Sequence, residues 1–160
     1  MEDPKRQAIR RVMTSSKKPE KAIYSAVFLD DPKDLLRWWE NNVGTPLHPK
    51  TFSHHMTIKF KPDVGDIKRL PMGSPIKLKI IGWSEDEKGQ AIVVQPQGIR
   101  STKSIPHITV ATNGAPPSYS NELLGRGWNP LHGGFLVGRV GYKGTKGSEV
   151  FDLTDTVYDF

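Results

Sequence analysis

Cysteine is absent from the 160-residue chain. Its absence excludes disulfide bonds, thiol nucleophiles and cysteine-based zinc sites, so any catalysis must use oxygen and nitrogen chemistry. The sequence also lacks an apolar run long enough for a membrane helix, and its N-terminal stretch MEDPKRQAIRR lacks the apolar segment of a secretory signal. We therefore expect a cytoplasmic protein with no membrane partner.

Acidic residues are fewer than basic ones, with 17 Asp and Glu against 23 Lys and Arg, which gives a formal net charge of +6. The first 21 residues hold seven of the basic and three of the acidic residues, and so contribute about +4. We interpret residues 1–20 as a basic, flexible N-terminal arm and residues 21–160 as a single domain. The mildly basic domain argues against duplex DNA as a partner and leaves room for a small anionic ligand.

The residue pattern predicts mostly strands. Acidic Asp30 and Asp31 followed by Pro32 predict the start of a helix over residues 33–42, whose Trp38 and Trp39 should pack on a sheet. A second, short helix is expected over residues 118–125. The expected strands cover residues 22–29, 76–83, 91–95, 135–142 and 149–158, together with one strand at each of the two motifs described next.

The two motif stretches are SHHMTIKF, residues 53–60, and PHITVAT, residues 106–112. Side chains alternate across a strand, so His55, Thr57 and Lys59 should share one face of the first strand. His54, Met56, Ile58 and Phe60 should share the opposite face, toward the core. In the second strand, His107 and Thr109 should lie opposite Ile108 and Val110. Both strands thus carry a His and a Thr on the face opposite to their apolar side chains.

This repetition of His-x-Thr is unusual for the composition. With five His and ten Thr in 160 residues, chance gives about 0.3 such triplets, and the chain has two. For either motif alone, a hydrogen-bonded structural histidine is the favoured interpretation. The coincidence of two motifs on two strands reverses that preference.

The motifs His55-Met56-Thr57-Ile58 and His107-Ile108-Thr109-Val110 resemble those of the 2H phosphoesterase superfamily. The resemblance implies an α+β, bilobal and pseudo-two-fold symmetric fold, with antiparallel sheets around a central cleft. Within the superfamily, the chain is most similar to the phage anti-CBASS nucleases, which degrade cyclic oligonucleotide messengers of a bacterial antiviral system. That similarity implies viral immune evasion in the host cytoplasm.

The chemistry also has a basis in the residues themselves. Two imidazoles can act as general acid and general base near neutral pH, and two hydroxyls can donate to the phosphoryl oxygens. We assign the acid and base roles to His55 and His107 and phosphate binding to Thr57 and Thr109, with no metal and no cofactor. Which His is the base stays open. A zinc or manganese site is the less favoured alternative, because no carboxylates or third His stand at ligand spacing near the motifs.

Further residues are candidates for substrate binding, chiefly Tyr24, Lys59, Trp83 and Glu149. Lys59 should face the same side as His55, and Arg100 or Lys103 could also attract phosphate. The resemblance implies base contacts for Tyr24 and Trp83, with core packing as the alternative, and a ligand contact or an orienting role for Glu149. Tyr142 and Tyr158 are further stacking candidates. We interpret His54, on the opposite strand face, as structural or as a support for a catalytic residue, and His48 and His132 as exposed loop residues.

Three interpretations of function stay open at this point. The first is a metal-independent nuclease that opens 3′,5′ bonds in cyclic di- and trinucleotides. The second is a 2′,3′-cyclic phosphodiesterase of RNA processing or repair. The third is a non-catalytic module that binds RNA or a nucleotide, which the presence of both intact motifs disfavours. The substrate would thus be a cyclic oligonucleotide or a short RNA-type molecule, and the pattern predicts no oligomeric state.

Overall fold

The computed structural model describes residues 21–152, so the expected arm over residues 1–20 lies outside the described residues, as do Tyr158 and the end of the last expected strand. Nine strands and three helices occur in the described part. They are β1 (Ala22–Leu29), α2 (Pro32–Asn42), β2 (Lys50–Thr51), β3 (His55–Phe60), α3 (Val64–Lys68), β4 (Pro75–Glu85), β5 (Gly89–Pro96), β6 (His107–Thr112), α4 (Tyr119–Gly125), β7 (Asn129–Pro130), β8 (Phe135–Gly144) and β9 (Glu149–Val150).

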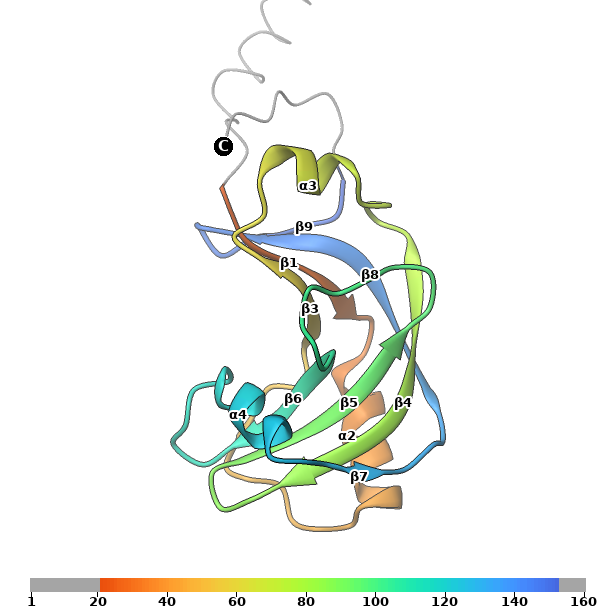
Figure 1. Ribbon diagram of the computed structural model, residues 1–160, viewed down its shortest axis with the longest axis vertical. Helices are drawn as coiled ribbons and strands as arrows, with labels where there is room; N and C mark the ends of the chain where they lie inside the picture. Colours follow the sequence, from red (N-terminus) through yellow and green to blue (C-terminus); the bar gives the residue numbers. More distant parts are fainter. Residues whose placement is uncertain (1–20, 153–160) are drawn as a thin grey trace, which may run out of the picture.

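Six strands close into one antiparallel barrel (Figure 1). Around the ring, β4 pairs with β5, β5 with β6, β6 with β3, β3 with β1, β1 with β8, and β8 returns to β4. The short strands β2, β7 and β9 pair with β6, β4 and β8. The expected bilobal α+β fold around a central cleft is therefore wrong. Both motif strands belong to one closed barrel, because the pairing of β4 with β8 closes what would otherwise be one open sheet.

The strands bury one face in a common core. Alternation in β3 and β6 turns Met56, Ile58, Ile108 and Val110 inward, as the sequence pattern predicts. The same cluster includes the following buried residues of other elements: Val27, Leu35, Trp38, Trp39, Ile76, Leu78, Ile80, Ile92, Val94, Leu136 and Val140. The outward side chains of β3 and β6 are consequently left to form a surface on the barrel wall.

Helix α2 begins where the sequence predicts. The Asp31 side chain accepts a hydrogen bond from the Lys33 amide, and Pro32 lies in the first turn. Trp38 and Trp39 are buried in the core, and Trp38 Nε1 donates to the Gly133 carbonyl at 2.6 Å. The core-packing prediction for these two tryptophans is confirmed.

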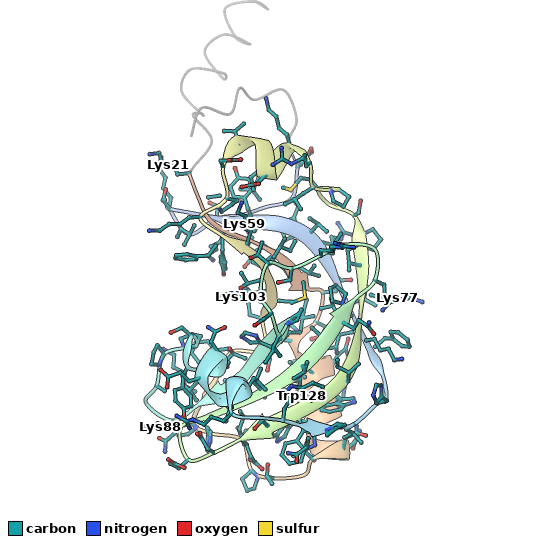
Figure 2. The ribbon with its side chains drawn as sticks, in the orientation of Figure 1. Lys21, Lys59, Lys77, Lys88, Lys103 and Trp128 are labelled. Atoms are coloured by element: carbon teal, nitrogen blue, oxygen red, sulfur yellow. The ribbon has the colours of Figure 1, made fainter. Side chains whose placement is uncertain are left out.

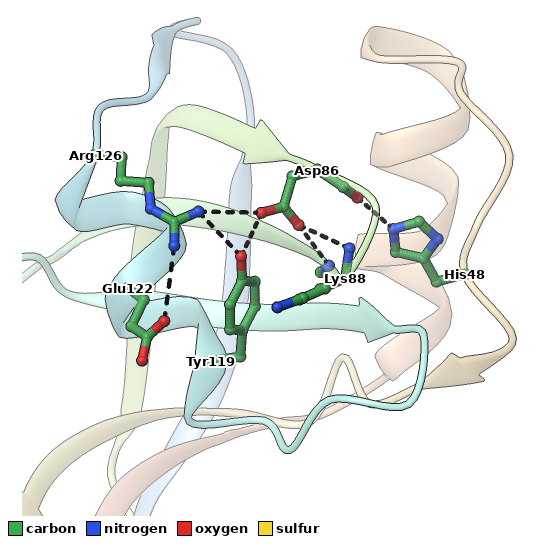
Figure 3. Close-up of polar contacts among 7 residues, drawn as sticks. His48, Asp86, Lys88, Tyr119, Glu122 and Arg126 are labelled. Carbon is green, nitrogen blue, oxygen red and sulfur yellow. Dashed lines mark hydrogen bonds and ion pairs between the residues drawn. The ribbon is translucent and has the colours of Figure 1, made fainter.

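The 118–125 helix and the 76–95 hairpin are also confirmed, and a network at the hairpin turn fastens α4 to the barrel (Figure 3). Asp86 accepts hydrogen bonds from the Tyr119 hydroxyl and from the amides of Lys88 and Gly89. Burial acts to raise the pKa of Asp86, but these bonds lower it below its usual range. Arg126 lies over the Tyr119 ring and contacts Asp86. This network holds α4 against the turn between β4 and β5.

Helix α3 has no counterpart in the sequence-based expectations. It carries a capping box in which Asp63 accepts from the Asp66 amide and Asp66 accepts from the Asp63 amide. Asp at the third helical position replaces the usual Glu or Gln, and the helix spans only five residues. A pattern of helical periodicity cannot register over so short a segment.

Candidate active site

The four motif side chains lie together on the outer face of the barrel. Met56 of β3 pairs with Ile108 of β6, and both side chains are fully buried. In an antiparallel pair, this register sets His55 beside Thr109 and Thr57 beside His107, on the face opposite to Met56 and Ile108. All four line a single pocket of about 670 Å³. The two-fold relation implied by the resemblance is thus local to one strand pair.

His54 does not lie where strand alternation predicts. Strand β3 begins at His55, and Ser53 just before it has a φ of 48°, in the left-handed region that is unusual for a residue other than glycine. The Ser53 amide donates to the Thr109 carbonyl and its hydroxyl donates to the Val110 carbonyl, which holds this bend against β6. The bend turns His54 into the same pocket as His55. The expectation of a core-facing His54 is therefore wrong.

A chain of hydrogen bonds connects His54 with both of its neighbours. His54 Nδ1 lies 3.0 Å from His55 Nδ1, and His54 Nε2 lies 2.8 Å from Glu149 Oε2 on β9. Because the carboxylate can only accept, His54 Nε2 carries a hydrogen. Glu149 also lies 3.9 Å from Lys143 Nζ, and it does not line the pocket itself. Glu149 is therefore placed to orient the His54 ring.

His55 is enclosed by aromatic rings. Its ring meets that of Tyr24 edge-to-face at 4.6 Å and that of Phe28 at 5.7 Å. Burial lowers the pKa of His55 to about 3, with further lowering from the charges of His54, His107 and Lys143. Burial, together with Glu149, raises the pKa of Tyr24 to about 12. His55 is therefore a neutral base near pH 7.

His107 is held from its other ring nitrogen. Its Nδ1 donates to the Ile105 carbonyl at 2.8 Å, which leaves Nε2 available to a ligand. Burial lowers the pKa of His107, Lys103 lowers it further, and the Ile105 carbonyl offsets part of that decrease. Both motif histidines thus have one nitrogen anchored by a neighbour.

The two motif threonines differ in availability. Thr109 Oγ1 donates to the Pro117 carbonyl at 3.0 Å and lies 2.8 Å from Ser120 Oγ, so its hydroxyl fastens the loop before α4. Thr57 has no side-chain hydrogen bond to any of residues 21–152. Thr57 is the hydroxyl ready to donate to a ligand, whereas Thr109 would have to release Pro117 first.

A β-bulge reverses the expected positions of Lys59 and Phe60. The register between β1 and β3 shifts where Ser25 and Ala26 face Lys59 and Thr57. As a result Lys59 turns away from the pocket and its ammonium lies 2.8 Å from Asp66 of α3. Phe60, expected in the core, is 56% exposed and lines the pocket. The predicted substrate contact at Lys59 is not supported by this placement.

Of the aromatic candidates within residues 21–152, only Tyr24 lines the pocket. Trp83 packs against the core, with its ring edge-to-face with Trp39 at 5.8 Å, which is the packing alternative considered above. Tyr142 is 1% exposed and belongs to the interior. Neither can stack on a base in this structure.

Two lysines also lie at the pocket. Lys143 of β8 and Lys103 of the loop before β6 both line the pocket and supply positive charge to it. Figure 2 shows Lys103 near the centre of the molecule, where β3 and β6 meet. Lys103 was a candidate from its position ahead of the second motif. Lys143 was not, because it reaches the pocket through the pairing of β8 with β1.

The remaining histidines lie elsewhere. His132 is exposed, as expected. His48 is not an exposed loop residue as predicted, since its Nε2 lies 2.7 Å from the Asp86 carbonyl and its amide donates to Gln90. Within residues 21–152, no group of three His, Asp or Glu side chains is arranged to hold a metal ion. None of the helices in that range is long and apolar enough to span a membrane.

Comparison with known proteins found no relative of the chain. No protein-family model matches the chain, and neither a curated protein nor a solved structure matches it.

Proposed function

We propose that this protein is a metal-independent phosphodiesterase of the 2H type that cleaves 3′,5′ bonds in cyclic oligonucleotides. One observation carries the proposal: His55, His107, Thr57 and Thr109 line one pocket, beside Lys103 and Lys143. Two imidazoles are sufficient for proton transfer in both directions, and the two ammonium groups favour an anionic phosphate. The similarity of the motifs to the anti-CBASS nucleases supports the choice of cyclic oligonucleotides as substrate.

The surroundings of the two histidines favour His55 as the general base. When Glu149 accepts from His54 Nε2 and His54 is neutral, His54 Nδ1 accepts from His55 Nδ1, which leaves the lone pair of His55 on Nε2. The depression of the pKa of His55 to about 3 keeps this nitrogen unprotonated. His107, whose Nδ1 donates to the Ile105 carbonyl, presents Nε2 to the leaving oxygen and is then the group that acts as general acid.

The reaction follows from these roles. His55 takes the proton of the substrate 2′-hydroxyl as that oxygen attacks the adjacent phosphorus. The bond from phosphorus to the 5′-oxygen breaks, and the leaving oxygen takes a proton from His107. The products are a 2′,3′-cyclic phosphate end and a 5′-hydroxyl end. Thr57 donates to a non-bridging oxygen, where negative charge develops.

A substrate panel assayed in EDTA tests the proposal. We expect cyclic dinucleotides to be opened to linear products that end in a 2′,3′-cyclic phosphate. Replacing His55 or His107 by Asn should lower kcat by roughly 10²- to 10⁴-fold. Activity lost in EDTA and restored by zinc or manganese would overturn the mechanism. Turnover of nucleoside 2′,3′-cyclic phosphates alone would instead assign the protein to RNA end processing, and no turnover of any member would leave a binding module.

A further inference from the structure

The candidate active-site pocket adjoins a second recess at Ile23. This side chain of β1 is 38% exposed and lines both cavities. The second recess, of about 770 Å³, lies between the start of β1 and the segment that joins β3 to α3. The two cavities therefore lie side by side, with Ile23 lining both.

Phe60 stands at the boundary between the two cavities. It is the last residue of β3, lines the first pocket and is 56% exposed. Lys61, which lines the second, places its ammonium 5.6 Å from the centre of the Phe60 ring. Lys61 has a φ of 51°, a left-handed conformation that a side-chain-bearing residue rarely adopts. An exposed ring beside a phosphate pocket, with a cation near one face, is a platform on which a nucleobase can stack.

The second recess carries basic side chains. Lys21, Lys61 and Arg69 line it, together with the carboxylate of Asp63. Asp63 accepts from the Asp66 amide in the capping box of α3. The side chain of Asp66 forms ion pairs with Lys59 and Arg69. Within residues 21–152, no carboxylate pairs with Lys21 or Lys61. The recess can therefore attract a second anion.

From this adjacency, exposure and charge we infer a subsite for a second nucleotide: Phe60 stacks on the base of the nucleoside on the 5′-oxygen side of the scissile phosphate, and Lys21 and Lys61 bind the next phosphate. The inference rests on the proposed function and extends it. It makes the preferred ligand one with at least two phosphates. It also assigns to Phe60 the stacking role that the sequence suggested for Trp83.

The chain contains a matched control pair. On the far side of the barrel, Lys77 lies 5.9 Å from the centre of the Phe135 ring, and Phe135 is 57% exposed. Figure 2 shows Lys77 at the opposite edge of the molecule from Lys21. Phe135 and Lys77 line neither cavity. Substituting them changes the same kinds of group without touching the proposed subsite.

The test measures binding by calorimetry, using probes that lack the 2′-hydroxyl nucleophile. The probes are a cyclic 3′,5′-linked di-deoxynucleotide and a deoxynucleoside 3′-monophosphate. We expect Phe60→Ala and Lys61→Ala each to weaken binding of the dinucleotide roughly tenfold, with little effect on the mononucleotide. Phe60→Trp should keep the affinity, since a ring remains, whereas Phe60→Leu should lose it. Phe135→Ala and Lys77→Ala should bind both probes as the wild type does.

Several results would overturn the subsite. They are equal losses for both probes, losses of similar size in the control pair, unchanged binding in the Phe60 and Lys61 variants, or a wild type that binds neither probe. Turnover of the ribose substrates is measured separately, so the two proposals fail independently. A wild type that binds the dinucleotide through Phe60 but cleaves nothing rejects the catalytic proposal alone. A wild type that cleaves, with Phe60 variants of normal affinity, rejects the subsite alone.

Discussion

At the scale of single residues, the pocket depends on two hydrogen bonds that run from Glu149 through His54 to His55. Glu149 lies 95 residues away from His54 along the chain and reaches it because β9 pairs with β8, which pairs with β1. His54 acts through His55, so it is a positioning residue for the proposed reaction. Its substitution should affect turnover, although strand alternation alone predicts an inert residue on the core face.

We predict that His54→Ala lowers kcat of the folded enzyme by roughly tenfold or more, because the His55 ring loses the partner that orients it. His54→Asn should retain more activity, since its amide can still meet His55 Nδ1 but no longer reaches Glu149. Steady-state kinetics against the cyclic dinucleotide measure both effects. His132→Ala, at an exposed loop position, is the control. Full activity in His54→Ala would show that His55 needs no orienting partner.

At the scale of elements, the register of three strand pairs decides which side chains reach the pocket. The single bridge between Met56 and Ile108 brings the two motifs together. The bulge between β1 and β3 exchanges Lys59 for Phe60 at the pocket. The pairing of β1 with β8 brings in Lys143, and it is unusually close at Gly138, where an added Cβ would lie 2.4 Å from the Phe28 carbonyl oxygen.

Gly138→Ala should therefore push β8 away from β1 and destabilise the barrel by roughly 1–3 kcal/mol, the usual cost of overpacking. Urea unfolding monitored by circular dichroism gives this free energy. Gly133→Ala is the matched control, because a Cβ there meets no atom within 4 Å and the residue does not have a positive φ. Equal stability of the two variants would mean that β1 and β8 can separate without cost.

At the scale of the whole molecule, the barrel half-buries two histidines, His55 and His107, on its outer face. The folded protein holds His55 with a pKa of about 3, against an ordinary value of 6.5, and lowers that of His107 as well. Between these values the unfolded chain binds more protons than the folded one. The stability contributed by neutral His55 is thus complete above about pH 6.5 and is lost as the pH falls toward 3.

We predict that the free energy of unfolding falls by about 2 kcal/mol through His55 alone between pH 7 and pH 5. This range lies above the pKa range of ordinary carboxylates, so histidines dominate the change. Urea titrations at both pH values, on the wild type and on His55→Asn, measure the difference. The variant should lose most of this pH dependence, and His132→Asn should keep it. A wild type whose stability is the same at both pH values would contradict the burial of a neutral His55.

The closed barrel could not be predicted from the sequence, for a physical reason. Periodicity correctly located β1, the hairpin of β4 and β5, and helices α2 and α4, because local alternation and capping report local structure. It could not report that β8 pairs with both β1 and β4, since register and partner choice depend on contacts between distant segments. The bilobal arrangement came from the resemblance, and the pairing of β4 with β8 contradicts it.

The amino-acid sequence by itself determined that each His-x-Thr pair lies on a strand whose opposite face is apolar. The structure places those four side chains at one pocket. Alternation within a strand is local, so this much could be predicted. Only the tertiary structure decided the roles of His54, Phe60 and Lys143. A left-handed Ser53, a bulge opposite Ser25 and the pairing of β8 with β1 turn these side chains toward the pocket. Each of these features depends on segments that are far apart in the chain, whose contacts exist only after the barrel has closed.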